Sequence, residues 1–381
     1  MAIWKRATVE QREEMVLAWL SGRYTGEEVA GRYEVSRTTL YAWVKRYRAR
    51  GREGLVDLAP IAKSCPHKTS EEIEEKIIDA RKRYGWGPKK LRVVLRRTEP
   101  KIQWPQPSTM GDILERHGLI EQRARRRKTK TPFRRKFEPA VAGELSTVDF
   151  KGQFKTLDGV YCYPLTMMDL TSRYLLSCEA LPSTAYEGVW PVYRRVFREH
   201  GLPKAMQSDN GVPFCGPSSV ARISRLSVNL MKLGIQPVFN ELGHPEQNGA
   251  HERMHASLAA ATVRPPAANR REQQRVFDRF RVIYNQERPH EALDQQVPAS
   301  RFNGSTRLFP ERAPKIDYAP HLEVRLVSEQ GAIKFKNQKY FLGLPLAHEL
   351  VALEAVDDGI WSLLLATFEL ARLDERTGDL R

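Results

Sequence analysis

Three acidic residues stand where a metal-binding site can form. Asp149 ends a short apolar segment, Asp209 lies just beyond the end of another, and Glu252 comes early in a segment of helical pattern. Ligands of α/β sheets bind where strands end, and Mg²⁺ and Mn²⁺ prefer carboxylate oxygens. Two such ions, roughly 4 Å apart, can activate an attacking oxygen and stabilise a leaving oxygen at phosphorus. We therefore expect the three acids to bind two Mg²⁺ ions, which Mn²⁺ can replace, for phosphoryl transfer.

Each acid also has a simpler structural explanation. Asp149 can merely end its strand, Asp209 opens an Asp-Asn-Gly turn signal, and Glu252 can be an exposed helix acid. Two further acids compete with the assignment, namely Glu246 in the loop before Glu252 and Asp169 at a strand turn. We expect Asp169 to be structural or to support the site from behind. Three acids in this order of elements favour catalysis over coincidence.

The segments around these acids alternate between strand and helix patterns. The expected strands cover 144–150, 159–168, 172–180, 203–207 and 235–239, and the expected helices cover about 184–200 and 219–233, before the helix with Glu252. Three strands followed by alternating helices and strands predict a mixed sheet flanked by helices, an α/β fold.

The first fifty residues predict a helix-turn-helix unit. Thr8 and Gln11 have the spacing of a capping box, and Ser36 precedes a third helix expected from Arg37 to Arg48. In a helix-turn-helix the start of this last helix reaches base edges in the major groove. A generic three-helix bundle is the alternative. The side chains expected to contact DNA are Arg37, Thr38, Thr39, Tyr41 and Lys45.

A second, similar unit follows a linker at 60–66. One helix is expected from Thr69 to Tyr84, another begins after Gly87, and Ser108 is expected to cap a third that ends at Arg116. The residues expected at its reading end are Ser108 and Thr109. Two such modules in tandem would lengthen the DNA site that is read.

The positive charge is concentrated in the first third of the chain. The formal net charge is +16, and residues 1–140 hold 33 Lys and Arg against 18 Asp and Glu, whereas the remainder holds 29 against 28. Such asymmetry is typical of a nucleic-acid-binding arm on a separate body. The densest part, 123–136, has no acid and is expected to follow a phosphate backbone; a solvated linker is the alternative. Its expected DNA contacts are Arg125, Arg126, Arg127 and Lys128.

The bulk composition excludes several other classes of protein. Hydrophobic residues make up 41% and charged residues 28% of 381 residues, and no apolar run reaches the ~18 residues of a membrane span. Four cysteines form no Cys-x-x-Cys pair and no disulfide scaffold. We expect a cytoplasmic protein without a membrane partner, and no structural zinc, because Cys65 and His67 have no partners at ligand spacing.

Three sequence blocks, 148–152, 208–214 and 244–253, together resemble the signature blocks of DDE transposases with a retroviral-integrase-type core. The segment Tyr284-Asn285-x-x-Arg288-Pro289-His290-Glu291-Ala292-Leu293 is similar to the post-catalytic motif of insertion-sequence transposases encoded in one reading frame. The resemblance implies an RNase H-like core with the catalytic triad Asp149, Asp209 and Glu252, and a homodimer or homotetramer on double-stranded DNA. It also suggests DNA contacts, for which the expected residues are Asn210, Asn248, Arg253 and His255.

These inferences combine into a multidomain architecture. We expect a helix-turn-helix domain over 1–59, a second helix-turn-helix or winged-helix-like domain over 60–122, a basic linker over 123–140 and an α/β catalytic core over 141–309. The alternating pattern of 310–381 predicts about five strands, and the resemblance suggests an SH3-like β-barrel.

The function expected is that of a DNA transposase. It would bind the terminal inverted repeats of its element, cleave 3′ ends and join them to target DNA. Two rivals stay open, a catalytically inactive DNA-binding regulator on the same fold and a metal-dependent nuclease that never joins DNA.

Overall fold

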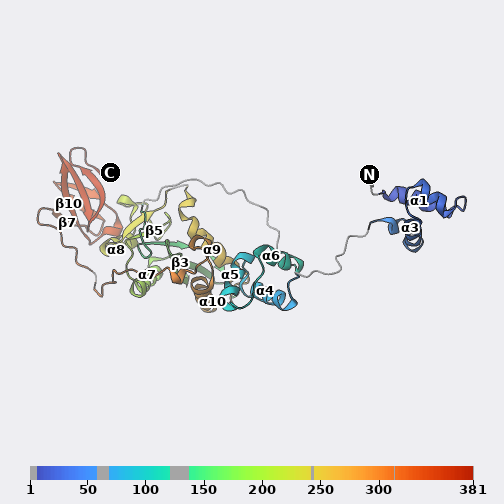
Figure 1. Cartoon of the computed structure of the whole chain (residues 1–381). Helices are drawn as coiled ribbons and strands as arrows, with labels where there is room; N and C mark the ends of the chain where they lie inside the picture. The colour runs from blue at the N-terminus through green and yellow to red at the C-terminus, as the bar shows by residue number, and fades with distance from the viewer. Residues whose placement is uncertain (1–6, 58–67, 121–136, 242–243, 313, 381) are drawn as a thin grey trace. The chain divides into compact units, whose positions relative to one another are not determined.

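The computed structural model describes residues 7–57, 68–120, 137–241, 244–312 and 314–380. The chain forms two compact units, Met1–Lys68 and Thr69–Arg381 (Figure 1). The expected DNA contacts Arg125, Arg126, Arg127 and Lys128 lie outside the described residues.

The first unit is a bundle of three helices, α1 (Val9–Leu20), α2 (Gly26–Arg32) and α3 (Arg37–Arg50). The capping box at Thr8 and Gln11 is confirmed, since the Thr8 side chain accepts from Gln11 N–H and the Gln11 side chain accepts from Thr8 N–H. Ser36 caps α3 by accepting from the Thr39 N–H. Buried apolar side chains hold the three helices together, namely Met15, Val16, Val29, Ala30, Leu40, Val44 and Leu55.

The second unit begins with another group of three helices, α4 (Glu71–Tyr84), α5 (Pro88–Thr98) and α6 (Pro107–Arg116). The expectation that Ser108 caps α6 is wrong. The helix starts one residue earlier, at Pro107, with Gln106 in the cap position. Proline suits the first helical position because its fixed φ matches the helix and its missing N–H would have had no partner there.

A mixed six-stranded sheet forms the centre of the second unit. Its strands are β1 (Leu145–Phe150), β2 (Phe154–Lys155), β3 (Tyr161–Asp169), β4 (Leu175–Leu181), β5 (Ala205–Ser208) and β6 (Gln236–Phe239). The order is β2-β3-β1-β5-β6, with β4 also paired to β3. β1 runs antiparallel to β3 but parallel to β5, and β5 runs parallel to β6. The mixed sheet expected from the sequence is confirmed.

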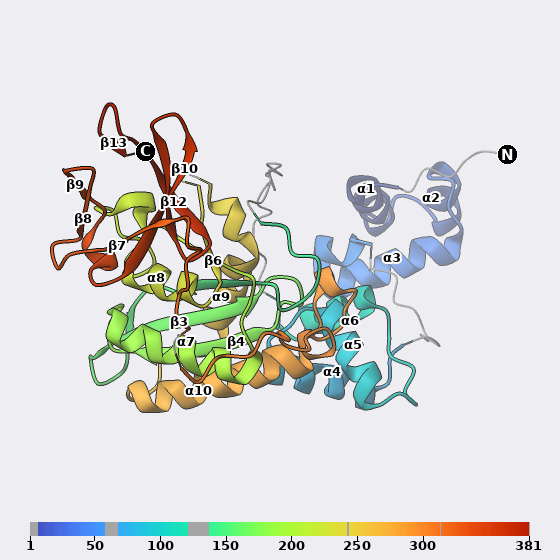
Figure 2. The same cartoon turned by 90° about the vertical axis from the view of Figure 1, so that its left-hand side faces the viewer.

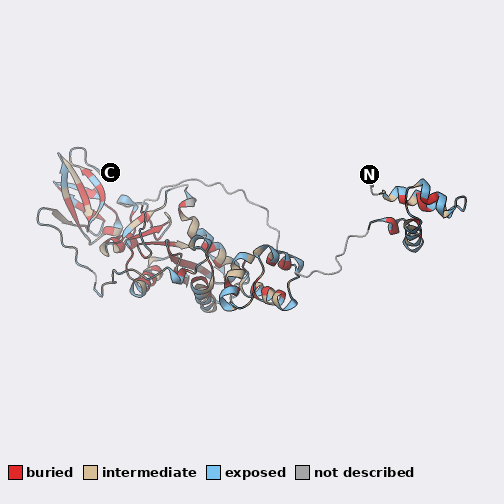
Figure 3. Cartoon of the chain, in the orientation of Figure 1, coloured by how far each residue is buried: buried red, intermediate tan, exposed pale blue. Residues whose placement is uncertain are grey.

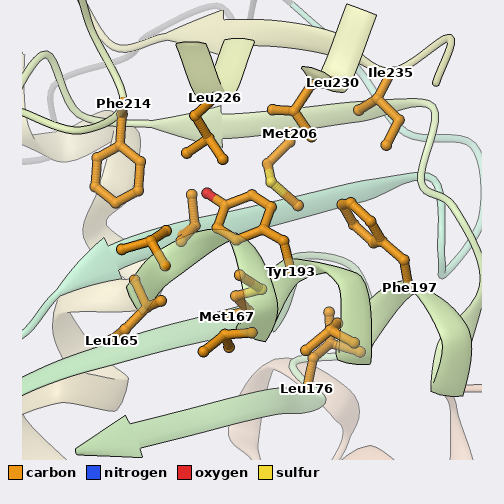
Figure 4. Close-up of a cluster of buried hydrophobic side chains, with 14 of the residues drawn as sticks. Leu165, Met167, Leu176, Tyr193, Phe197, Met206, Phe214, Leu226, Leu230 and Ile235 are labelled. Atoms are coloured by element: carbon orange, nitrogen blue, oxygen red, sulfur yellow. The ribbon is translucent and has the colours of Figure 1, made fainter. Parts of the chain in front are cut away.

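Helices cover both faces of this sheet (Figure 2). On one face α7 (Tyr186–His200) and α8 (Arg225–Lys232) pack on the sheet, and Tyr193 and Phe197 of α7 share a buried cluster with Leu165 and Met167 of β3 (Figure 4). On the other face α9 (Gly249–Thr262) and α10 (Arg270–Val282) pack through Phe277 and other side chains on the alternate residues of β3. Successive side chains of a strand point to opposite faces, so one strand supplies two cores, both buried (Figure 3).

The long helix expected over 219–233 is wrong. A single 3₁₀ turn at Val220–Arg222 is followed by a separate start of α8, whose cap is Ser224. Ala221 and Arg222 both have positive φ, which an α-helix of L-residues does not tolerate. The Val220 N–H donates to the Leu342 carbonyl, so this break ties the core to the C-terminal region.

The C-terminal region consists of β7 (Glu323–Leu326), β8 (Ala332–Phe335), β9 (Gln338–Phe341), β10 (Leu350–Asp357), β11 (Ile360–Leu365), β12 (Phe368–Asp374) and β13 (Asp379–Leu380). Five of these strands form an open antiparallel sheet, β13-β12-β11-β10-β7, beside a separate β8-β9 hairpin. Closure into an SH3-like barrel is therefore not confirmed. The sheet packs on α8 through Val228 and Met231, and Lys232 pairs with Glu349 at 2.8 Å. None of the described helices is long and apolar enough to cross a membrane.

Candidate active site

The register of two parallel strands places Asp149 and Asp209 side by side. The last residues paired between β1 and β5 are Thr147 and Gln207. Asp149 lies two residues after Thr147, and Asp209 lies two residues after Gln207. Both acids therefore reach the same edge of the sheet, at the carboxyl ends of adjacent parallel strands. This is the edge at which ligands of α/β sheets bind.

The start of α9 lies against this edge. Asn248, the residue that precedes the first turn of α9, donates from its side-chain nitrogen to Asp149 Oδ2 at 2.9 Å. Glu252 follows four residues later, in the first turn of the helix. Residues four apart share one face of a helix, so Asn248 and Glu252 lie on the same side of α9. Glu252 is exposed, and its charge is felt at Asp149.

The electrostatics of Asp149 are those of a crowded carboxylate. Its side chain is 17% exposed, and its pKa is raised from 3.8 to about 7. Burial is the largest cause, and the negative charges of Asp209 and Glu252 add to it, while hydrogen bonds from Phe150 N–H and Asn248 oppose it. Like charges gathered in a partly buried site disfavour the ionised form. A bound cation would remove that penalty.

A buried hydrogen-bond network supports Asp149 from behind. The Thr166 hydroxyl donates to the Asp149 carbonyl at 3.0 Å and also lies 2.6 Å from His251 Nε2 and 2.7 Å from His255 Nε2. His251 Nδ1 is in turn hydrogen-bonded to Thr147 Oγ1 at 2.7 Å. These contacts fasten α9 to β1 and β3, so they fix the distance between the helix and the aspartates.

Both histidines of this network are kept neutral. Burial lowers the pKa of His255 to about 3, with help from the charge of Lys151. Burial also lowers the pKa of His251, and His255 adds to that effect. Sequence reasoning missed His251 entirely, although two histidines four residues apart beside Glu252 were a visible sign of an inward-facing stripe.

Several expected DNA contacts are engaged within the protein instead. His255 is buried, so we no longer expect it to contact DNA. Asn248 holds Asp149, and Asn210 donates from its side-chain nitrogen to the Asn240 carbonyl at 2.7 Å. Arg253, in contrast, is exposed.

Of the two acids that compete with the assignment, Asp169 and Glu246, the structure describes the side chain of Asp169. Asp169 is fully buried and accepts from Gly143 N–H at 2.8 Å and from Ser172 N–H at 2.7 Å. Its role is structural, since it joins the turn before β1 to the β3-β4 turn. The side chain of Glu246 lies outside the described part of the chain.

The three acids do not form a closed metal cage. Among the described residues, no group of three His, Cys, Asp or Glu side chains is close enough to hold a metal ion. Their chemistry nevertheless fits a divalent cation, because all three offer hard oxygen ligands, and burial together with the charges of Asp209 and Glu252 raises the pKa of Asp149.

The expected reading residues of the helical units lie at the surface. On α3, Arg37, Thr38, Tyr41 and Lys45 are exposed, and Thr39 is half-buried. Positions 38, 41 and 45 share one face of the helix. On α6, Ser108 and Thr109 are exposed. Most of the expected reading residues are therefore exposed to solvent.

Family models match three parts of the chain. Residues 233–298 match the integrase core domain, residues 11–63 match a helix-turn-helix domain, and residues 39–114 match a homeodomain-like domain. The integrase match contains Glu252 and the 284–293 motif, and it begins after Asp209.

The chain is also similar to solved retroviral structures. One is the HTLV-2 integrase catalytic core domain in complex with magnesium, in its trimeric form, with 10% identity and a TM-score of 0.34, covering 44% of this chain and 100% of that one. Another is a simian T-cell lymphotropic virus intasome in complex with PP2A regulatory subunit B56 gamma, with 12% identity and a TM-score of 0.39, covering 75% of this chain and 91% of that one. The integrase core match and the two helix-turn-helix-type matches are consistent with the resemblance to insertion-sequence transposases with a retroviral-integrase-type core.

Proposed function

We propose that this protein is a DNA transposase that cleaves 3′ ends at the terminal inverted repeats of its element and joins them to target DNA. The observation that carries the proposal is the convergence at one sheet edge. The β1-β5 register brings Asp149 beside Asp209, and Asn248 ties the helix of Glu252 to Asp149. The helix-turn-helix and homeodomain-like matches on the same chain favour DNA as the substrate.

Asp149, Asp209 and Glu252 are the residues that would hold two Mg²⁺ ions. Bound there, the ions would supply an activated oxygen nucleophile and stabilise the leaving oxygen at phosphorus. The protein's own part is positional. Asn248 orients the Asp149 carboxylate, and the network through Thr166 holds α9 at a fixed height above the sheet.

DNA recognition is divided between backbone and base contacts. The exposed stripe Arg37, Thr38, Tyr41 and Lys45 and the start of α6 would read the terminal repeats in the major groove. The catalytic core would hold target DNA largely through its phosphates. Two ends must be joined in concert, so the active form would be a homodimer or homotetramer.

The experiment is a Mg²⁺-dependent strand-transfer assay with the DNA that flanks this gene. Asp209→Asn removes one expected ligand, and Asp358→Asn, in an exposed turn of the C-terminal sheet, is the matched control. Joined products from wild type and control, but not from Asp209→Asn, would support the proposal. Cleavage without joining would favour a nuclease instead. Specific DNA binding with neither reaction, in Mg²⁺ or Mn²⁺, would favour an inactive regulator.

A further inference from the structure

A basic cavity lies beside the catalytic helix, and the proposed chemistry does not use it. Its volume is about 280 Å³. The described residues that line it include Lys90, Arg173, Arg253, Ser257, Arg288 and Glu291. They come from α5, the β3-β4 turn, α9 and the segment after α10, so the cavity belongs to no single element.

The cavity and the acids occupy opposite sides of α9. Its lining residues Ala250, Arg253, Met254 and Ser257 lie three or four residues apart and form one stripe along the helix. Asn248, Glu252 and His255 form another stripe with the same spacing. At about 3.6 residues per turn the two stripes point roughly half a turn apart. One helix therefore serves both sites, and the cavity is distinct from the acid cluster.

The charge of the lining is strongly unbalanced. Four of the described lining residues are lysine or arginine, from four different segments, and one, Glu291, is a carboxylate. Burial and the nearby charge of Arg288 lower the pKa of Lys90 to about 8, although Glu291 opposes this shift. His290 adds no positive charge at neutral pH, because burial and the charges of Lys90 and Arg288 lower its pKa to about 3. Gathering cations in this way costs free energy unless an anion joins them.

The motif at 284–293 builds this site. Asn285 uses its side-chain amide to bond both the N–H of Leu175 at 2.8 Å and the carbonyl of Leu175 at 2.9 Å, which fixes the segment to the edge of β4. Arg288 donates to the Ser257 hydroxyl at 2.9 Å and lies over the rings of Trp86 and Tyr284. The guanidinium is therefore held in place before any ligand arrives.

The same segment joins the second helix-turn-helix unit to the core. Tyr84, at the end of α4, donates its hydroxyl to Glu287 Oε2 at 2.7 Å, and Arg97 of α5 donates to the Glu287 carbonyl at 3.3 Å. Lys90 reaches the cavity from this docked unit. The site thus combines one cation from a DNA-reading unit with cations from the catalytic core.

We propose that this cavity binds a phosphate group of the DNA strand that runs between the second helix-turn-helix unit and the active site. Arginine and lysine are the usual ligands of phosphate oxygens. A volume of about 280 Å³ is below the range of drug-sized pockets, and it suits an anionic group better than a base pair. The inference rests on the proposed function for the source of the phosphate. A free phosphate ion is the alternative source of the same chemistry.

The test compares two adjacent lysines of α5 in the full-length protein. Lys90 lines the cavity, whereas Lys89 is exposed and does not. Affinity for a terminal-repeat duplex is measured by fluorescence anisotropy between 50 and 200 mM salt, without divalent cation. We expect Lys90→Gln to reduce the slope of log affinity against log salt by about 0.9, the value for one phosphate contact. Lys89→Gln should keep the wild-type slope, and Lys90→Arg should restore it.

The outcomes separate the two sources of phosphate. Wild-type slopes in both glutamine variants would overturn the proposal. An equal reduction of the slope in both variants would also overturn it, because the effect would then belong to the general surface of α5. Thermal unfolding with inorganic phosphate forms the second arm. Stabilisation of wild type but not of Lys90→Gln, with unchanged DNA slopes, would assign the cavity to a free anion. Failure of strand transfer leaves this binding comparison intact, so it tests the transposase proposal alone.

Discussion

Replacing Asp149 by asparagine should stabilise the metal-free protein, although it should abolish catalysis. Asparagine keeps an oxygen that can accept from the Asn248 side chain, the contact that Asp149 makes at 2.9 Å. It removes the negative charge that burial and the charges of Asp209 and Glu252 disfavour. The variant therefore separates the cost of the charge from the loss of the contact.

The size of the effect follows from the pKa of Asp149, which rises from 3.8 to about 7 on folding. One pKa unit corresponds to about 1.4 kcal/mol. A carboxyl with a raised native pKa stabilises the fold while it is protonated and loses that contribution as the pH rises to the native value. Because the Asp149 carboxyl ionises more readily in the unfolded chain, it lowers the free energy of unfolding by about 2 kcal/mol at pH 5 and by about 4 kcal/mol at pH 8. The advantage of Asp149→Asn over wild type should grow by that difference.

Denaturant unfolding of both proteins at pH 5 and pH 8, without divalent cations, measures this change. The difference between the proteins at each pH cancels the titration of other groups. Added Mg²⁺ at pH 8 should stabilise wild type more than Asp149→Asn, because ligands stabilise the state that binds them. An advantage that is equal at both pH values, or a variant less stable than wild type at pH 8, would refute the crowded-carboxylate reasoning.

Three further substitutions test the supports of the site. Thr166→Val removes the hydroxyl shared by His251 and His255, and we expect a loss of about 2 kcal/mol in unfolding free energy and slower strand transfer; an unchanged rate would show that the network does not position α9. Asp169→Ala leaves two buried N–H groups without an acceptor and should cost about 3 kcal/mol, measured by denaturant unfolding, without changing the Mg²⁺ dependence of catalysis. Asn285→Leu should cost about 3 kcal/mol by the same measurement, and a neutral result would mean that the motif is not fastened to β4.

Local patterns determined much of this protein. The capping box at Thr8 and the cap at Ser36 follow from short-range hydrogen bonding, and both could be predicted from a few residues. Most of the strand and helix order of the core also followed from hydrophobic periodicity, although the short strand β2 was not predicted. Periodicity could not predict the break in the helix expected over 219–233. The positive φ of Ala221 and Arg222 accompanies a hydrogen bond from Val220 to Leu342, which is far away in the chain.

The candidate site shows the same division. The three acids were visible in the sequence because their types and their places at element ends point to one chemistry. Their proximity, however, comes from the register of β1 against β5 and from the Asn248 contact, which join residues far apart in the chain.

The buried network and the basic cavity depended on tertiary structure altogether. His255 was expected at a DNA surface and is buried behind Asp149, and Lys90 meets Arg253 and Arg288 only where four segments converge. Residue types and spacing thus indicated the chemistry that we propose for this chain. The tertiary structure decided which charged side chains lie close enough to interact. Burial and electrostatic repulsion depend on distance in space and not on position along the chain.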